Sequence, residues 1–448
     1  MNVYTATFST KDGHIANGCF CIDERNKIEI RIETRDKTVH NSLLRETILN
    51  CVSNNKQYFF SELMVKNGGY TANNNGDATY FVEIDAYLFG EGINCYDLDD
   101  LQIKEVTTGF NYLNLWYKGI SPVAISYSEH LQSLQENYTG KAVSTKFEIN
   151  EDLTLELQVY GTDLIGFIEK FQVVFNCKSQ KLKDYNSALD KFGRFLSLLC
   201  HLKVEVNEPI TCFLEEGYFI LHRYIWVFDE KTYPHLLTTY DEIKDSFSDI
   251  IKNYYNTPKL FPVIQTVNSS LYIPNSMVGG ISERFLLLTK TVESMYSLNL
   301  LYDFSDDEEK YKNQISEILA RVENKSDRAF LSQKLANSQR ATFKMKFIQF
   351  LQLFKTVFLE NDKDIDLFAK IIKDTRNYYT HVAQVPQRII AENKLSLINR
   401  MLEYMITYHL LWWYNDKKII KGRFTLLNQS LVAVKSIING DLNNLCKD

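Results

Sequence analysis

The periodicity of the apolar residues changes near residue 280, and this change limits the folds that the chain can adopt. Before that point apolar and polar residues alternate, as in 28–32 and 82–86. After it, Phe285, Leu288 and Val292 recur at spacings of three and four. Alternation is typical of strands with one buried face, and the wider spacing is typical of amphipathic helices. The sequence therefore predicts an α+β protein, in which a β-rich N-terminal domain precedes an all-α helical bundle.

The N-terminal part contains further strand signals and two helical patterns. Residues 147–149 and 153–157 also alternate, so we expect antiparallel sheets with one buried and one solvated face. Clusters of Asn and Gly at 67–69 and 73–77 predict turns. The remaining signals predict helices over about 181–202 and 240–255, and strands around 203–206 and 218–228.

The C-terminal part reads as a series of helices. Helical spacing covers about 282–296, 312–321, 328–335, 341–360, 362–381, 388–414 and 425–439. The run from Asp303 to Lys312 reads as a charged break, and Pro386 argues against one helix from 362 to 414. We expect a β-rich module over 1–180, a mixed α/β region over 181–280 that packs on it, and the helical domain over 281–448.

Charge is divided unevenly between these parts of the 448-residue chain. Residues 1–280 contain 25 Lys and Arg against 36 Asp and Glu, a net charge of −11. Residues 281–448 contain 25 against 20, a net charge of +5. Only the C-terminal part therefore suits a polyanionic partner such as RNA.

Several classes of protein are excluded by what the sequence lacks. No apolar run reaches ~18 residues, and Met1–Thr5 do not resemble a secretion signal. The eight cysteines form no C-x-x-C pair, and Cys19 and Cys21 have no second pair to complete a zinc site. We therefore expect a cytoplasmic protein with reduced thiols, without a membrane segment, a metal or a cofactor. Walker, G-x-S-x-G and H-E-x-x-H motifs are also absent from the sequence.

One segment carries residues suited to catalysis: Arg376-Asn377-Tyr378-Tyr379-Thr380-His381. Arginine is always charged and can bind a phosphate through two N–H groups. Histidine titrates near neutral pH and can act as a general acid or base. Such groups can cleave RNA without metal: a base takes the proton of the ribose 2′-hydroxyl, the oxygen attacks the phosphate, and an acid protonates the leaving oxygen.

The spacing of the motif constrains its geometry. At ~100° per residue, Arg376 and His381 point ~140° apart on a straight helix, whereas Asn377 and His381 share a face. Either the helix deforms near its end or a second chain contributes. A two-fold homodimer that brings two copies of this helix together would place both motifs in one cleft.

The same residues also have ordinary structural interpretations. His381 can simply cap the last turn of its helix, and Tyr378 and Tyr379 can serve packing. Lys370 and Lys373 lie near the motif and form either a phosphate-binding track or a solvated helix face. His409 lies on an apolar helix and is interpreted as a packed core histidine.

With these residues, the chain resembles HEPN domains. The segment from Arg376 to His381 fits their R-x4–6-H signature, with the polar Asn377 after the arginine. Glu293 lies on an early helix of the same helical region. The whole chain is similar to the ApeA-type arrangement, in which a β-rich domain precedes an Apea-like HEPN domain.

The resemblance implies a metal-independent endoribonuclease of an anti-phage, abortive-infection system. It implies that Arg376 and His381 are catalytic, with Asn377 in support. Glu293 and Tyr379 are further supporting candidates, and Lys370 and Lys373 are candidates for RNA binding. It also implies a homodimer through the HEPN domain, and the acidic N-terminal module is interpreted as the sensor of a phage-derived trigger.

Two alternatives remain open. In the first, the HEPN bundle is a non-catalytic module that dimerises or binds RNA. In the second, the protein is a metal-dependent nuclease.

Overall fold

The computed structural model of the protein describes most of the chain. The described residues are 2–72, 77–118, 143–162, 168–201, 203–206, 208–224, 236–271, 280–298, 300, 305–338, 342–359, 361–380, 388–438 and 440–446. The chain folds into two compact units, of which the first comprises Met1–Pro234 and Thr239–Asn256. The second comprises His235–Thr238 and Thr257–Asp448. The three-part division expected from the sequence stays a prediction.

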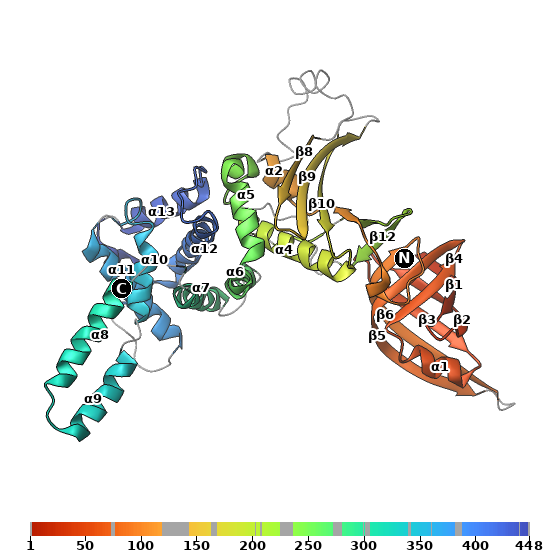
Figure 1. Ribbon diagram of the computed structural model, residues 1–448, viewed down its shortest axis with the longest axis horizontal. Helices are drawn as coiled ribbons and strands as arrows, with labels where there is room; N and C mark the ends of the chain where they lie inside the picture. The colour runs from red at the N-terminus through yellow and green to blue at the C-terminus, as the bar shows by residue number, and fades with distance from the viewer. Residues whose placement is uncertain are drawn as a thin grey trace, which may run out of the picture. The chain divides into compact units, whose positions relative to one another are not determined.

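The first unit begins with six antiparallel strands that close on themselves (Figure 1). They are β1 (Asn2–Ser9), β2 (Ile15–Ile22), β3 (Ile28–Thr34), β4 (Ile48–Ser53), β5 (Lys56–Ala72) and β6 (Ala78–Glu91), with α1 (Lys37–Leu43) between β3 and β4. Their order is β3-β2-β1-β4-β5-β6, and a ladder from Ile28 opposite Ala86 to Thr34 opposite Tyr80 joins β3 to β6. Closure leaves these two strands without a free edge along that ladder.

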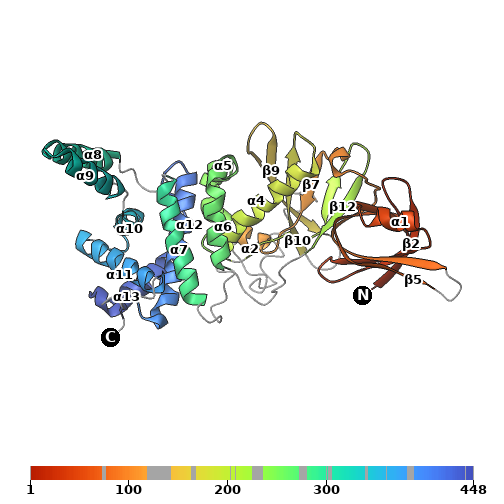
Figure 2. The ribbon, with the colours of Figure 1, turned by 90° about the horizontal axis from the view of Figure 1, so that it is seen from below.

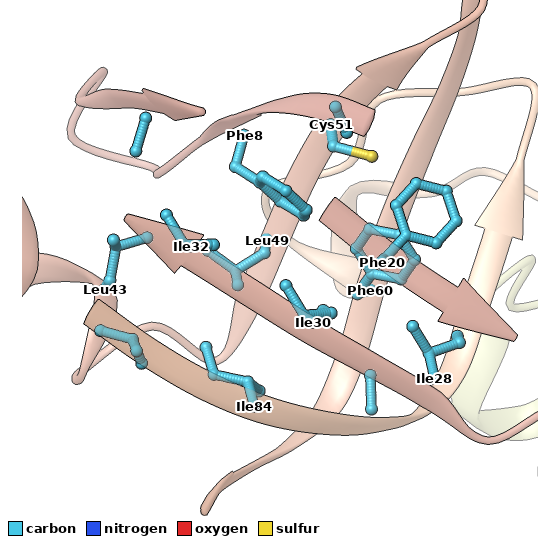
Figure 3. Packing of buried hydrophobic residues seen from close by; sticks show 14 of the residues in the cluster. Phe8, Phe20, Ile28, Ile30, Ile32, Leu43, Leu49, Cys51, Phe60 and Ile84 are labelled. Carbon is cyan, nitrogen blue, oxygen red and sulfur yellow. The ribbon is translucent and has the colours of Figure 1, made fainter. Parts of the chain in front are cut away.

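The apolar residues of the alternating pattern form the interior of this closed sheet. Ile28, Ile30 and Ile32 of β3 are buried, whereas Glu29 and Arg31 between them point outward. Figure 3 shows the three isoleucines side by side with buried residues from β1, β2, β4, β5 and β6. The predicted strands at 28–32 and 82–86 are therefore confirmed, and each owes its stability to this shared apolar interior.

The sheet continues from β6 through the second half of the first unit. The strands are β7 (Glu105–Thr108), β8 (Val143–Glu148), β9 (Leu153–Thr162), β10 (Ile168–Cys177), β11 (Ile210–Phe213) and β12 (Tyr218–Arg223), in the order β12-β11-β7-β10-β9-β8. Helices α2 (Leu113–Lys118), α4 (Leu182–Cys200) and α5 (Tyr240–Asn256) pack with it, α4 on β10 and α5 on β8. A short 3₁₀ turn, η1 (Leu98–Asp100), precedes β7.

Aromatic residues form the contact between these helices and the sheet. Trp116 of α2 is fully buried and meets the rings of Tyr240 and Phe247 of α5 edge-on or tilted. Phe147 of β8 also meets Phe247 edge-on. The predicted helices over 181–202 and 240–255 are thus confirmed, with their apolar faces against the sheet.

The elements described in the second unit are helices, joined by turns and loops (Figures 1 and 2). Its elements are η3 (Pro258–Leu260), α6 (Phe261–Leu271), α7 (Gly280–Ser297), α8 (Ser305–Ala320), α9 (Lys325–Ser338), α10 (Phe343–Gln352), α11 (Asp362–Thr380), α12 (Glu392–Tyr414), α13 (Thr425–Ile438) and η4 (Leu442–Leu445). Helix α7 packs against α6, α10, α11 and α12 and is therefore central to the bundle. The α+β prediction is confirmed.

Some sequence expectations are wrong in detail. Residues 67–69 lie inside β5, where the pairing with β6 shifts register between Val65 and Asn67, and do not form a turn. The charged run 305–312 is part of α8, so it does not break the helices. The strand expected around 203–206 is only an isolated bridge at Val206, and the strand forms at β11 instead. Residues 73–76, where another turn was predicted, lie outside the described residues.

An ion pair lies in the core of the bundle. Both carboxylate oxygens of Glu403, which is 1% exposed, accept from the Arg284 guanidinium, with 2.6 Å between Oε2 and Nη2. Ser270 Oγ lies 3.4 Å from Oε1. The pair thus joins α6, α7 and α12. Burial raises the pKa of the Glu403 carboxyl, and the guanidinium opposes this shift. In the described residues, no helix is long and apolar enough to cross a membrane.

His409 is a buried histidine of α12, as the sequence predicted. Its exposed fraction is 2%, its Nε2 lies 2.9 Å from the carbonyl oxygen of Phe350, and its ring stacks on the Phe350 ring. Burial lowers the pKa of the His409 imidazole to about 4, because charging it inside the core would cost hydration. The folded protein therefore holds this histidine neutral.

We expect this histidine to make stability dependent on pH. Below its ordinary pKa of 6.5, the imidazole binds a proton in the unfolded chain but not in the folded one until about pH 4, so stability falls as the pH falls through this window. Between pH 7 and pH 5 the loss is about 2 kcal/mol. Urea unfolding at both pH values should show the loss in the wild type and a smaller one in His409→Gln. Equal losses in both proteins would contradict this expectation.

Candidate active site

Helix α11 presents the arginine of the motif at the surface of the bundle. Its apolar positions, Ile365, Phe368, Ile371 and Ile372, are buried and hold one face of the helix against its neighbours. Arg376 lies beyond this apolar stripe, and its side chain is 27% exposed. The periodicity that predicts the helix thus also places the guanidinium at the edge between the core and water.

Glu293 of α7 binds the guanidinium of Arg376. Its Oε2 lies 2.7 Å from Nη2 of Arg376, and the glutamate side chain is also 27% exposed. The two residues are 83 positions apart, so only the packing of α7 against α11 brings them together. Among the named candidates, Glu293 and Arg376 are therefore in direct contact.

A second cation from α10 reaches the same carboxylate. Nζ of Lys346 lies 3.8 Å from Oε1 of Glu293, and the lysine side chain is 18% exposed. One carboxylate thus lies between two cations, each near a different oxygen. The formal charge of the three groups is +1, which suits the site to an anion.

Two aromatic rings lie under the cations. The Arg376 guanidinium carbon lies 4.8 Å from the centre of the Phe343 ring, and Nζ of Lys346 lies 5.4 Å from that of Tyr296. Tyr296 follows Glu293 by three residues on α7, and Lys346 follows Phe343 by three on α10. Residues three apart share a helix face, so each helix contributes one charged and one aromatic group to this site. Cations over ring faces gain electrostatic attraction.

The other named residues of α11 lie around this site. Three of these residues are half-buried, namely Lys373, Asn377 and Tyr379, whereas Lys370 is exposed. Lys373 precedes Arg376 by three residues, so it shares that side of the helix, whereas Lys370 lies ~120° away. Burial raises the pKa of the Tyr379 phenol, and the Glu392 carboxylate adds to this shift. The tyrosine is therefore held as a neutral hydroxyl at neutral pH.

His381 follows directly after the last residue of α11 and lies outside the described residues, as does Pro386. The structure therefore gives no geometry for the histidine. The chain is described again from Arg388, where Ile390 donates its backbone N–H to Oγ1 of Thr375, at 3.0 Å. Ile390 also bridges to Cys446. Both ends of the segment that contains His381 are thus attached to the bundle.

Sequence reasoning did not find Lys346, Phe343 or Tyr296. Their spacing of three residues on two separate helices contains a signal, but any amphipathic helix offers many such pairs. Only the packing of α7, α10 and α11 selects these pairs. Among the described residues, no group of three or more His, Cys, Asp or Glu side chains is arranged to hold a metal ion.

The second unit is thus a helical bundle that presents two partly exposed cations around one carboxylate, an arrangement whose net charge suits an anionic ligand. In a comparison with protein families, residues 294–412 match the family described as Apea-like HEPN. This match agrees with the resemblance to Apea-like HEPN domains that the sequence predicted, and it indicates a nuclease-type or RNA-related function. Comparisons with curated proteins and with solved structures each found no significant match.

Thr375 provides a test of how the motif helix is anchored. Its side chain is fully buried, and its hydroxyl accepts from Ile390 N while donating to the carbonyl oxygen of Ile371. Thr375→Val removes the hydroxyl at nearly constant shape and leaves the Ile390 N–H unpaired. We expect a loss of about 1–3 kcal/mol in the free energy of unfolding, measured by urea denaturation. Thr375→Ser keeps the hydroxyl and should lose less; equal losses would contradict the role of this hydrogen bond.

Proposed function

We propose that the HEPN domain is a metal-independent endoribonuclease that cleaves RNA by attack of the ribose 2′-hydroxyl. The observation that supports this most is the position of Arg376: a partly exposed guanidinium, oriented by Glu293, five residues before His381. Arg376 and His381 are the catalytic residues of this proposal. RNA is the substrate class because only RNA carries the internal nucleophile.

The proposed reaction needs no cofactor. A base takes the 2′-hydroxyl proton, the 2′-oxygen forms a bond to phosphorus, and the bond from phosphorus to the 5′-oxygen breaks. An acid donates a proton to that leaving 5′-oxygen. The products are a 2′,3′-cyclic phosphate and a 5′-hydroxyl. His381 acts as base or acid, and Arg376 stabilises the negative charge that develops on the phosphate.

A homodimer through the HEPN domain completes the proposal. One imidazole in one protonation state cannot be base and acid in the same step, so a second His381 from a partner chain supplies the other function. Two-fold symmetry places two copies of the motif face to face. Asn377, four residues before His381 in the sequence, supports the histidine, and Tyr379 is a further neutral donor of the motif. Lys370 and Lys373 bind the flanking backbone of the RNA.

Substitutions in the motif test the nuclease function. We expect His381→Ala to reduce RNA cleavage by about 10²–10⁴-fold and Arg376→Ala by at least 10²-fold. Arg376→Lys keeps a charge but loses the two-pronged geometry, so it should recover only part of the activity. Sequencing of RNA ends from cells that express wild type or His381→Ala, and cleavage of purified RNA in vitro, give the measurement.

Metal removal discriminates the alternatives. We expect EDTA to leave wild-type cleavage unchanged, and the products to end in a 2′,3′-cyclic phosphate. Loss of cleavage in EDTA would favour a metal-dependent nuclease. Undiminished cleavage by Arg376→Ala and His381→Ala would remove the motif from the mechanism. RNA binding without cleavage by the wild type would favour a non-catalytic HEPN module.

We propose further that the nuclease acts in cytoplasmic anti-phage defence by abortive infection, and that the first unit senses a phage-derived trigger and restrains cleavage. Its acidic charge and its size support this, since the residues proposed for catalysis all lie in the second unit.

Truncation tests the restraint. The truncated chain starts at Thr257, so that it keeps α6, which packs on α7 and approaches Glu403 through Ser270. We expect this chain to arrest growth of uninfected cells when the full chain does not, and His381→Ala to abolish the arrest. Equal growth with both chains, given equal soluble amounts, would contradict a restraining role.

A further inference from the structure

We propose that Lys346 and Arg376 together bind one phosphodiester group of the RNA, and that the Glu293 carboxylate occupies the place of this phosphate in the free protein. The inference rests on the proposed function for the identity of the ligand. It adds a residue, Lys346, that lies outside the motif, and it gives Glu293 the role of an internal competitor.

The Glu293 carboxylate meets the two cations with different oxygens. Oε2 of Glu293 lies 2.7 Å from Arg376, and Oε1 lies 3.8 Å from Lys346. A phosphodiester also presents two equivalent anionic oxygens on one atom and carries one negative charge. The space between the two cations therefore accepts an anion of this kind, and the glutamate is the one that occupies it in the free protein.

Aromatic rings hold the two cations in place. Phe343 lies under the Arg376 guanidinium, and Tyr296 lies under the Lys346 ammonium. A ring face attracts a cation electrostatically and leaves N–H groups of the cation available as hydrogen-bond donors. The N–H groups that meet Glu293 can thus be transferred to a phosphate while the rings keep the cations in place. Preorganised donors of this kind lose little entropy when the ligand binds.

The three charged side chains are accessible to solvent. The side chains of Lys346, Glu293 and Arg376 are 18%, 27% and 27% exposed. Solvent screens ion pairs at such exposure, so the glutamate is held weakly enough to be displaced. When a phosphodiester displaces the glutamate, the total charge of the two cations and the anion between them stays nearly the same, because one monovalent anion replaces another. Lys346 and Arg376 also come from separate helices, which fixes the orientation of the phosphate.

Binding of a non-cleavable RNA tests the inference. The probe is a fluorescent oligonucleotide with 2′-O-methyl riboses, which lacks the attacking hydroxyl, titrated with the full chain at several salt concentrations. We expect Lys346→Met to weaken binding by roughly threefold to tenfold and to lower the slope of log affinity against log salt by about one. Lys346→Arg should bind like the wild type. Glu293→Gln should bind more tightly than the wild type, because the competing charge is gone.

Lys344 provides the matched control. It lies on the same helix two residues earlier, it pairs with Asp366 at 2.5 Å, and its side chain is 29% exposed. Lys344→Met removes an equal charge from the same element, so we expect no comparable loss of affinity. Equal losses with Lys344→Met and Lys346→Met would overturn the proposal, because the effect would then be general electrostatics.

Three other results would overturn it: unchanged binding by Lys346→Met, weaker binding by Glu293→Gln, or no binding by the wild type at low salt. Thermal unfolding of each variant separates lost binding from lost folding, and Lys346→Gln, which also removes the charge, repeats the test if Lys346→Met does not fold. Failure of this inference and failure of the nuclease function give different results. If the wild type cleaves unmodified RNA and Lys346→Met binds the probe as tightly as the wild type does, only this inference is wrong. If binding depends on Lys346 but the wild type cleaves no RNA, only the proposed nuclease function is wrong.

Discussion

The contact of one carboxylate with two cations connects the three helices that make the candidate active site. Glu293 of α7 meets Arg376 of α11 and Lys346 of α10, and each cation lies over an aromatic ring. Without the carboxylate, two positive groups would repel one another at the edge of an apolar core. The glutamate therefore keeps a site for an anion intact before any ligand arrives, and its partial exposure keeps this arrangement reversible.

The bundle supports this site with buried and partly buried polar contacts. Glu403 and Arg284 join α12 to α7, and Thr375 attaches α11 to Ile390, in the segment that follows the motif. Such groups are costly to bury and stable only when each has its partner, so they favour one arrangement of the helices over others of similar apolar content. Precise placement of a few charged atoms at the surface thus depends on contacts in the interior.

Much of the architecture could be predicted because it follows from local periodicity. Alternation identified β3, β6 and β9, and spacings of three and four identified α4, α5, α7, α11 and α12. The failures have physical causes. Gly68 and Gly69 lie within β5 because pairing with β6 overrides their preference for turns. Residues 305–312 are helical although they read as a charged break, since Glu and Lys are good helix formers and acidic residues suit the first turn of a helix. The pairing of β3 with β6, which closes the sheet, joins strands some fifty residues apart and has no local signal.

For the candidate site, the sequence by itself determined the chemical types and one spacing: an arginine on an amphipathic helix, a polar residue directly after it and a histidine five residues after it. That information is local, because it depends on residues a few positions apart. Only the tertiary structure decided which other groups join Arg376, since Glu293 lies 83 residues and Phe343 33 residues away along the chain. Helix packing sets those distances, and packing depends on the complementary shapes of whole apolar faces, which no single motif encodes.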